Sequence, residues 1–276
     1  MKIGIFDSGL GGLITLHGAR EALAAYDVVY LGDTAHLPYG DKTKEQVFEF
    51  TKRAVEYLFK QDCKLVFLFC NTASAEALRK IQQEFLPKFY PNRHVLGIII
   101  PTVEVAITSP PGHDREKRGS RRIGVLATQG TVDSHTYLKE IQKRNSNAEV
   151  FQQAAPKLVP HIESGILTNL AYARLVNMYL DPLLERNIDT LILGCTHYAI
   201  IKNQIKKLLP LKVQLICQDE IIGSKITEYL SNHAEIETIL SKNKTRQYLV
   251  TKLTPEFENH AKAWLGESLK LERISL

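Results

Sequence analysis

The sequence predicts an α/β protein made of two similar parallel-sheet domains, with the active site in the cleft between them. Short apolar runs, typical of buried parallel strands, alternate with segments of helical periodicity along nearly the whole chain. Strands that alternate with helices indicate a parallel sheet with helices on both faces. In addition, one predicted strand in each half leads into a cysteine motif, and ligands of open α/β sheets bind beyond the carboxyl ends of strands.

The first half begins with a strand at Ile3–Phe6, followed by a helix that places Leu13, Leu16, Ala19 and Leu23 on one face. The elements after it are a strand at Val28–Leu31, a helix at Lys44–Lys60, a strand at Lys64–Phe69, a helix at Ala75–Phe85 and a strand at Val95–Ile100, which Pro101 is expected to end.

The second half repeats this alternation. Its predicted elements are a strand at Ile123–Ala127, a helix at Val132–Arg144, a strand at Glu149–Gln153, helices from Val159 and at Leu170–Glu185, a strand at Thr190–Leu193, a helix at Ile200–Leu209, a strand at Lys212–Ile216, helix to about Leu240, a strand at Gln247–Thr251 and a helix at Glu256–Leu265.

The segment Ser109–Ser120, with its prolines and glycines, is the best internal boundary, and the strand at Lys212–Ile216 can lead the chain back to where it started. We therefore expect a first domain of residues 1–99 plus 217–276 and a second domain of residues 100–216.

Composition is that of an ordinary soluble globular protein, with 276 residues, 44% hydrophobic and 24% charged. Its four cysteines form no C-x-x-C pair or zinc-type spacing, so we expect no metal site and an intracellular location. The apolar run after Met1 is too short for a signal peptide, and no stretch reaches the length of a membrane span. Much of the +5 net charge clusters at Arg115–Arg122. No aromatic residues interleave these charges as a nucleic-acid surface would require, so we interpret the segment as a solvated loop.

Cys70 and Cys195 each follow a buried apolar run and each precede Thr or Asn-Thr at a predicted helix start, where backbone N–H groups favour a thiolate. A lone free cysteine is usually inert packing, and we interpret Cys63 and Cys217 in that way. Two cysteines at matching strand ends instead predict one thiol from each half, facing a shared ligand.

The turn Asp7–Gly12 follows the first strand and opens a helix. It could bind an anion through close backbone approach, or it could be a tight structural turn. A dinucleotide site is a rival, because Asp33 ends the next strand where a ribose-binding acid would lie, although Ile14 replaces the third glycine of that fingerprint. A role for Asp7 and Ser8 stays open on these residues alone.

Three other features are weaker candidates. The polar segment Asp33–Gly40 ends in a Pro-Tyr-Gly turn that could line a pocket or could simply connect two elements. His197 lies two residues beyond Cys195, where it could tune the thiol or transfer a proton, or could be a buried structural histidine. Glu163 by itself would be interpreted as a solvated helical glutamate.

The motifs GIFDSGLGGL, GDTAHLPYG, CNTASA, GVLATQGTVDS, LVPHIESG and LGCTHY occur in this order, and a C-terminal part from Tyr248 to Gly266 completes the pattern. With these motifs the chain resembles the glutamate racemases, of the cofactor-independent aspartate/glutamate racemase superfamily. The resemblance spans nearly the whole chain, and the paired cysteine motifs are its most specific part.

The resemblance implies that Cys70 abstracts the α-proton of D-glutamate and Cys195 that of L-glutamate, with Asp7 and His197 assisting their respective thiols and Glu163 as a possible further carboxylate. Racemisation suits two acid/base groups, because a proton leaves one face of the substrate and another arrives on the opposite face. The substrate ammonium and carboxylates would then be held by Ser8, Pro38, Tyr39, Gly40, Asn71, Thr72, Thr128, Thr131 and Thr196.

No cofactor, pyridoxal phosphate or metal is implied, and glutamate is the expected partner, without nucleic acid or membrane. The enzyme would be cytoplasmic and would supply D-glutamate for peptidoglycan; a homodimer is a possible assembly. Three alternatives stay open: a racemase of aspartate or another amino acid, a nicotinamide oxidoreductase, and a non-catalytic dicarboxylate-binding protein.

Three positions depart from the pattern of the resembled family. Thr102 stands where a small residue or glycine usually follows the proline, and Ala155 stands where a cysteine is often found before Pro156. The segment Asp219–Ile221 replaces a common Asp-Ser-Gly. We expect these departures to affect the connections between the domains rather than the paired thiols.

Overall fold

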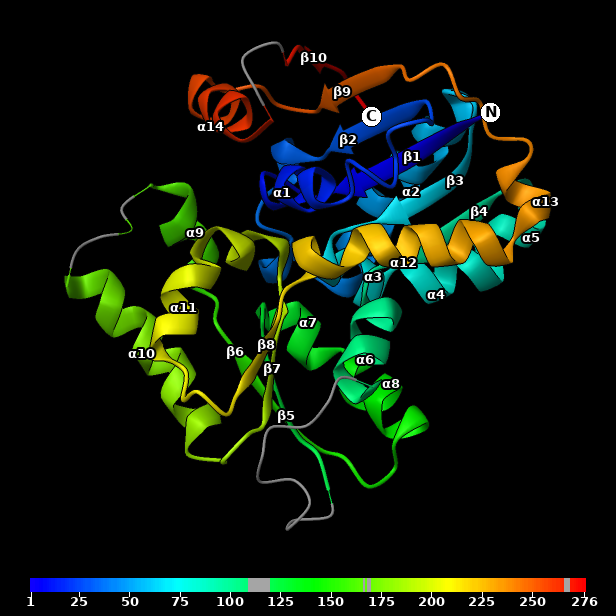
Figure 1. Cartoon of the computed structure of the whole chain (residues 1–276). Coiled ribbons are helices and arrows are strands. Elements are labelled where there is room, and N and C mark those ends of the chain that lie inside the picture. The colour runs from blue at the N-terminus through cyan, green and yellow to red at the C-terminus, as the bar shows by residue number, and fades with distance from the viewer. Residues whose placement is uncertain (109–119, 166, 168–169, 266–268) are drawn as a thin grey trace.

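Two parallel β-sheets, one of six strands and one of four, form the framework of the protein (Figure 1). The structure is a computed structural model, and it describes residues 1–108, 120–165, 167, 170–265 and 269–276. Every pair of neighbouring strands among these residues is parallel, which confirms the predicted fold class.

The first sheet has the strand order β10-β9-β2-β1-β3-β4. Its strands are β1 (Lys2–Asp7), β2 (Val28–Gly32), β3 (Cys63–Leu68), β4 (His94–Gly97), β9 (Arg246–Val250) and β10 (Leu271–Arg273). Side chains alternate between its two faces, so that Ile5 packs into the core on one face and Phe6 into the core on the other. Both faces are covered, which explains why the central strands are apolar throughout.

Helices α1, α12 and α14 pack on one face of the first sheet, and α2 with the short helices after α3 packs on the other. Thr43 caps α2, because its hydroxyl accepts from the Gln46 N–H and the Gln46 side chain accepts from the Thr43 N–H. The helices of this part are α1 (Gly11–Gly18), η1 (Thr34–His36), η2 (Tyr39–Asp41), α2 (Lys44–Lys60), α3 (Asn71–Glu76), α4 (Leu78–Lys80), η3 (Ile81–Phe85), α5 (Leu86–Phe89), α12 (Gln218–Asn232), α13 (Ala234–Glu237) and α14 (Pro255–Leu265).

The second sheet has the order β6-β5-β7-β8, from β5 (Arg122–Ala127), β6 (Glu149–Ala154), β7 (Thr190–Gly194) and β8 (Gln214–Ile216). Helices α9, α10 and α11 cover one face, and α6 and α8 cover the other. These helices are α6 (Ile99–Thr108), α7 (Gln129–Asp133), α8 (Thr136–Arg144), α9 (Leu158–Glu163), α10 (Leu170–Leu184), η5 (Thr196–Ile201) and α11 (Lys202–Leu208).

The chain crosses between the sheets twice, from β4 into α6 and from β8 into α12, and α12 lies along the junction (Figure 1). Ile99 and Val103 of α6 are part of the second core, whereas Ile222 and Ile226 of α12 are part of the first. The division into residues 1–99 plus 217–276 and residues 100–216 stays our proposal, and Ile99, which it assigns to the first domain, packs in the second core. Most of the predicted boundary segment Ser109–Ser120, with its basic cluster, lies outside the described residues.

Several predicted element boundaries are wrong. The strand at Val95–Ile100 ends at Gly97, and α6 begins at Ile99 with Pro101 in its first turn. Proline fits there because an N–H in the first turn of a helix has no intrahelical acceptor. The helix α1 ends at Gly18, although Ala19 and Leu23 are buried as their spacing predicted.

Two further differences concern turns and an unpredicted strand. The predicted helix at Val132–Arg144 is divided into α7 and α8 by His135, whose φ of 55° is left-handed. The strand β10, at Leu271–Arg273, was not predicted. Among the described helices, none is long and apolar enough to cross a membrane.

Candidate active site

Cys195 follows β7 directly, Cys70 lies two residues beyond Leu68 at the end of β3, and both thiols line one small cavity between the two sheets. Its volume is about 20 Å³, which is room for about one water molecule, so an amino acid fits only when the walls move apart. The lining residues are Ser8, Leu37, Pro38, Tyr39, Gly40, Cys70, Asn71, Thr72, Thr128, Val159, Cys195, Thr196 and His197. The sequence had not indicated Leu37 or Val159, and the predicted Asp7, Thr131 and Glu163 are not part of this lining.

The thiol of Cys70 lies at the N-terminus of α3, where its sulfur accepts a hydrogen bond from the Ala73 N–H at 3.4 Å. The Ser8 hydroxyl lies 3.3 Å from the same sulfur. Burial, and next the negative charge of Asp7, raise the pKa of Cys70 to about 12. Cys70 is therefore a neutral thiol in this state, able to donate a proton.

On the opposite side, His197 connects Cys195 to a carboxylate. Its Nδ1 lies 3.9 Å from the Cys195 sulfur and its Nε2 lies 3.0 Å from Oε1 of Glu163, on α9. Burial alone lowers the pKa of His197, but the hydrogen bonds and charges of Cys195 and Glu163 outweigh it and raise the pKa to about 10. A cationic imidazole beside Cys195 can stabilise its thiolate or supply a proton.

Asp7, at the end of β1, links the two sides of the site. Its carboxylate accepts hydrogen bonds from the Gly9 N–H at 2.8 Å and from the Thr196 hydroxyl at 3.2 Å. Burial raises the pKa of Asp7 to about 6, close enough to neutrality for proton exchange. Its hydrogen bond reaches the Cys195 side, whereas its effect on Cys70 is electrostatic.

A glycine is required where the two sheets meet at this site. A Cβ on Gly11 would lie 2.5 Å from the backbone nitrogen of His197, closer than atoms can approach. The glycine-rich turn is thus needed for packing against the Cys195 loop, and it brings Ser8 to the cavity and Asp7 to the Thr196 hydroxyl.

Three threonine hydroxyls form a cluster beside the Cys70 helix. Oγ1 of Thr72 lies 3.0 Å from that of Thr128 and 3.3 Å from that of Thr131. Thr72 follows a strand of the first sheet, whereas Thr128 and Thr131 follow a strand of the second. Thr128 also caps α7 by accepting from the Thr131 N–H. Rotatable hydroxyls can donate to a carboxylate, so this cluster suits an anionic substrate group.

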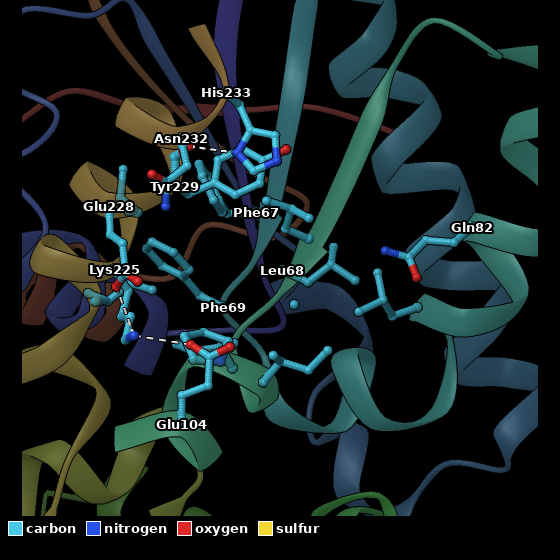
Figure 2. Close-up of a pocket in the computed structure, with 18 residues that line it drawn as sticks. Phe67, Leu68, Phe69, Gln82, Glu104, Lys225, Glu228, Tyr229, Asn232 and His233 are labelled. Atoms are coloured by element: carbon cyan, nitrogen blue, oxygen red, sulfur yellow. Dashed lines mark hydrogen bonds and ion pairs between the residues drawn. The ribbon is translucent and has the colours of Figure 1, made fainter. Parts of the chain in front are cut away.

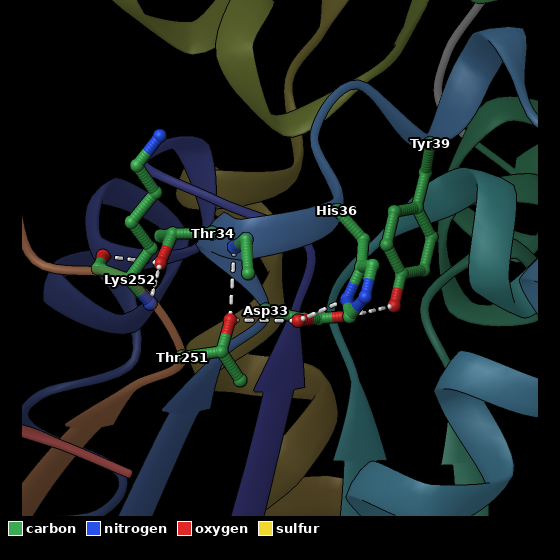
Figure 3. Close-up of polar contacts among 7 residues, drawn as sticks. Asp33, Thr34, His36, Tyr39, Thr251 and Lys252 are labelled. Carbon is green, nitrogen blue, oxygen red and sulfur yellow. Dashed lines mark hydrogen bonds and ion pairs between the residues drawn. The ribbon is translucent and has the colours of Figure 1, made fainter. Parts of the chain in front are cut away.

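The loop that carries Pro38, Tyr39 and Gly40 is held by Asp33, as Figure 3 shows. The buried Asp33 carboxylate accepts from the Tyr39 hydroxyl at 2.6 Å and the Thr251 hydroxyl at 2.7 Å, and it lies 2.9 Å from Nδ1 of His36. Burial and then the Asp33 charge hold the pKa of Tyr39 well above its usual range, so its phenol remains a donor. These three partners occupy the Asp33 carboxylate, which a dinucleotide site would need free to bind a ribose hydroxyl.

Two larger cavities lie outside the cavity that the thiols line. One, of about 280 Å³, adjoins Leu37 and Glu163 and is also lined by Lys252 and Glu256. The other, of about 240 Å³, lies between β3, α6 and α12 (Figure 2), and neither thiol is among its lining residues. Among the described residues, no three or more His, Cys, Asp and Glu side chains are grouped to hold a metal ion.

Comparisons with known proteins agree on one family. The family model for Asp/Glu/Hydantoin racemase matches residues 17–220. A glutamate racemase of Picosynechococcus is 36% identical and covers 99% of this chain and 92% of its own length. A crystal structure of a glutamate racemase isoform from Bacillus anthracis has a TM-score of 0.87 at 31% identity and covers 100% of this chain and 97% of its own. The Francisella tularensis glutamate racemase in complex with D-glutamate has a TM-score of 0.84 at 31% identity, covering 99% and 97%.

Proposed function

The chain belongs to the Asp/Glu/hydantoin racemase family, and we propose that it interconverts L-glutamate and D-glutamate with Cys70 and Cys195 as the two acid/base groups. The observation that carries this proposal is the pair of thiols, which come from the ends of strands in different sheets and line the same cavity. A group on each face of the α-carbon is what inversion by proton transfer needs.

With L-glutamate, the Cys195 thiolate takes the α-proton, and the electron pair of that C–H bond stays on the α-carbon beside its carboxylate. The thiol of Cys70 then donates its proton to the opposite face, which gives D-glutamate and leaves a thiol at Cys195 and a thiolate at Cys70. The reverse reaction starts from that second protonation state. His197 beside Cys195 and Asp7 near Cys70 are placed to move the protons that restore either state.

The starting protonation states follow from the surroundings of the thiols. Cys70 is buried near a carboxylate and keeps its proton, while Cys195 lies beside a histidine that two neighbours hold in its cationic form. The proposed reaction needs one thiolate and one thiol at the same time, and a cationic imidazole is a neighbour that stabilises a thiolate.

Polar groups of the cavity wall would hold the substrate. Hydroxyl, amide and backbone N–H groups of Ser8, Tyr39, Gly40, Asn71, Thr72, Thr128 and Thr196 would donate to the carboxylates. Pro38 has no N–H and would contribute only surface to the wall, and Thr131 would act from behind it through its contact with Thr72. Because the cavity is about 20 Å³ as it stands, the two sheets with their loops must separate to admit glutamate and then close around it.

The product, D-glutamate, is used in bacterial peptidoglycan, so we propose that the protein supplies this precursor in the cytoplasm. A homodimer is also a prediction. Cell fractionation tests the location, and sedimentation analysis tests the assembly.

Circular dichroism of the purified protein with each enantiomer of glutamate and aspartate, without added cofactor, tests the proposal. Both glutamate signals should decay to zero at the same final composition, and the aspartate signals should persist. Racemisation of aspartate in preference to glutamate would overturn the substrate assignment. Activity only after addition of pyridoxal phosphate would overturn the mechanism.

A further inference from the structure

A buried hydrogen-bond network lies directly behind Cys70 and joins four elements. We call it the junction network, and its members are Asn71, Thr102, Tyr137 and Gln218, all 2% exposed or less. Oδ1 of Asn71 accepts from Nε2 of Gln218 at 2.7 Å and from the Tyr137 hydroxyl at 2.8 Å. Nδ2 of Asn71 donates to Oε1 of Gln218 at 2.8 Å, so the two amides form a reciprocal pair.

The network connects both crossings between the sheets to the Cys70 helix. Gln218 is the first residue of α12, immediately after the second crossing, and its Nε2 also lies 3.4 Å from Oγ1 of Thr102 in α6, just after the first. Tyr137 belongs to α8 on the second sheet. Asn71 is the first residue of α3, next to Cys70.

One of the unusual positions of this sequence lies in the network, and another is adjacent to it. Thr102 is one departure from the resembled family pattern, and Gln218 immediately precedes another, at Asp219–Ile221. Gln218 contacts Thr102 on one side and Asn71 on the other, so its amide joins the two crossings to the start of α3.

The side chain of Asn71 is therefore held from behind rather than free to turn toward a substrate. Its neighbour Cys70 is oriented by α3 itself, because the Ala73 N–H donates to the sulfur. A shift of the start of α3 thus moves the thiol relative to anything held by the second sheet. The small cavity must open and close in each turnover, so Cys70 needs a fixed reference on the second sheet to which it returns.

We propose that Gln218 is a positioning residue for racemisation, which through Asn71 aligns the Cys70 thiol with the substrate α-carbon at the junction of the two sheets. This inference rests on the proposed two-thiol reaction. Gln218 does not line the cavity around the thiols, and it acts through the amide pair.

Two variants and one matched control separate this role from general loosening of the junction. Gln218→Leu removes the amide and keeps a similar volume, whereas Gln218→Glu replaces the Nε2 donor by an oxygen facing Oδ1 of Asn71. The control is Glu104→Gln, which breaks the Glu104–Lys225 ion pair of 3.0 Å between the same helices, α6 and α12 (Figure 2), without touching Asn71.

Both Gln218 variants should lose at least about tenfold in kcat while KM changes little, because a misplaced thiol slows proton transfer more than it weakens binding. The control should retain the wild-type kcat. The two enantiomers have equal free energies, so kcat/KM must be the same in both directions for every variant and cannot show which thiol is misaligned.

Deuterium isotope effects on kcat/KM can show which thiol is misaligned. If Cys70 is misaligned, its proton transfer becomes more rate-limiting, so the effect should rise with α-deuterated D-glutamate and fall with α-deuterated L-glutamate. A merely destabilised protein would change neither. If Gln218→Leu does not fold by circular dichroism, Gln218→Glu and Tyr137→Phe, which removes the other donor to Asn71, give the same readout.

Isotope effects that stay at the wild-type values, or that move together, would overturn the inference, as would Gln218 variants as active as the Glu104→Gln control. Wild-type protein that does not racemise glutamate would instead overturn the proposed function, and the inference would fall with it. The wild-type assay therefore distinguishes the two failures.

Discussion

Replacement of Glu163 by glutamine is expected to lower the pKa of His197 and so to narrow the pH range of activity. Oε1 of Glu163 lies 3.0 Å from Nε2 of His197, and the glutamate side chain is 31% exposed while the histidine is 3% exposed. The substitution keeps the shape of the side chain and a hydrogen-bonding oxygen, and it removes one negative charge from beside the imidazole.

The magnitude follows from the geometry. Two unit charges about 4 Å apart interact by about 4 kcal/mol at an effective dielectric constant of about 20. Solvent reaches about a third of Glu163, so screening reduces this to roughly 1–2 kcal/mol. One pKa unit corresponds to about 1.4 kcal/mol, so the pKa of His197 should fall from about 10 to roughly 9.

The assay is the pH profile of kcat/KM between about pH 6 and 10.5 for wild type and variant. If the cationic form of His197 is the active one, the alkaline limb should move down by about one pH unit in Glu163→Gln. The substrate ammonium titrates identically in both experiments, so any difference between the profiles comes from the enzyme. Glu256→Gln is the matched control, because Glu256 lines the same cavity of about 280 Å³ and His197 is bonded to Glu163 instead.

Unfolding in urea provides a second readout with a defined sign. The folded pKa of His197 lies above its unfolded value of about 6.5, so its contribution to stability is complete below pH 6.5 and is lost as the pH rises through about 10. Glu163→Gln should therefore be less stable than wild type by roughly 1–2 kcal/mol at pH 8, with the difference fading above about pH 10. Coincident alkaline limbs for all three proteins would refute the assignment of His197 as the titrating group.

Four further outcomes are expected. Tyr39→Phe removes a donor to the buried Asp33 carboxylate and should cost about 1–2 kcal/mol in urea unfolding, whereas an unchanged midpoint would mean that this hydrogen bond contributes nothing. Ile192→Ala, fully buried in β7, should cost about 2–5 kcal/mol by the same measurement, and a cost near zero would contradict the packing described. Cys63→Ala should leave kcat unchanged, because Cys63 is buried away from the cavity between the thiols, and a large fall would give it a role not proposed above. Dialysis against a chelator should leave racemisation intact, and activity restored only by added metal would refute a purely proton-transfer mechanism.

The parts of the fold that the sequence predicted are those with a local signal. Buried parallel strands such as Leu191–Leu193 are apolar on both faces, and a polar residue at the end of the run locates the edge of the sheet. Cys70 and Cys195 could be placed together because the carboxyl ends of parallel strands are where such sheets form their sites. The polar residues of the site were predicted only from the order of the motifs and the family resemblance that it carries. Hydroxyl and amide side chains follow no periodicity along the sequence that would mark them as site residues.

The rest depends on tertiary contacts that no local pattern reports. Pro101 is typical of a strand end as much as of a first helical turn, and only packing on the second sheet selects the helix. Gln218 lies 147 residues from its partner Asn71, so nothing near either residue indicates the pair. From its strand end Asp33 could be a ribose-binding acid in one alternative, and nothing near it in the sequence indicates its partner Thr251, which comes from the far end of the chain.

The measurement that tests the two-thiol reaction most directly is racemisation of protiated L-glutamate in D₂O, followed by NMR at low conversion. With Cys195 and Cys70 on opposite faces, the D-glutamate formed should carry deuterium at the α-carbon, because its new proton comes from a thiol equilibrated with solvent. The remaining L-glutamate should stay protiated, because Cys195 returns the proton that it has just removed. Equal deuterium in both enantiomers from the start, or protium retained in the product, would show that a single group serves both faces and would contradict the mechanism.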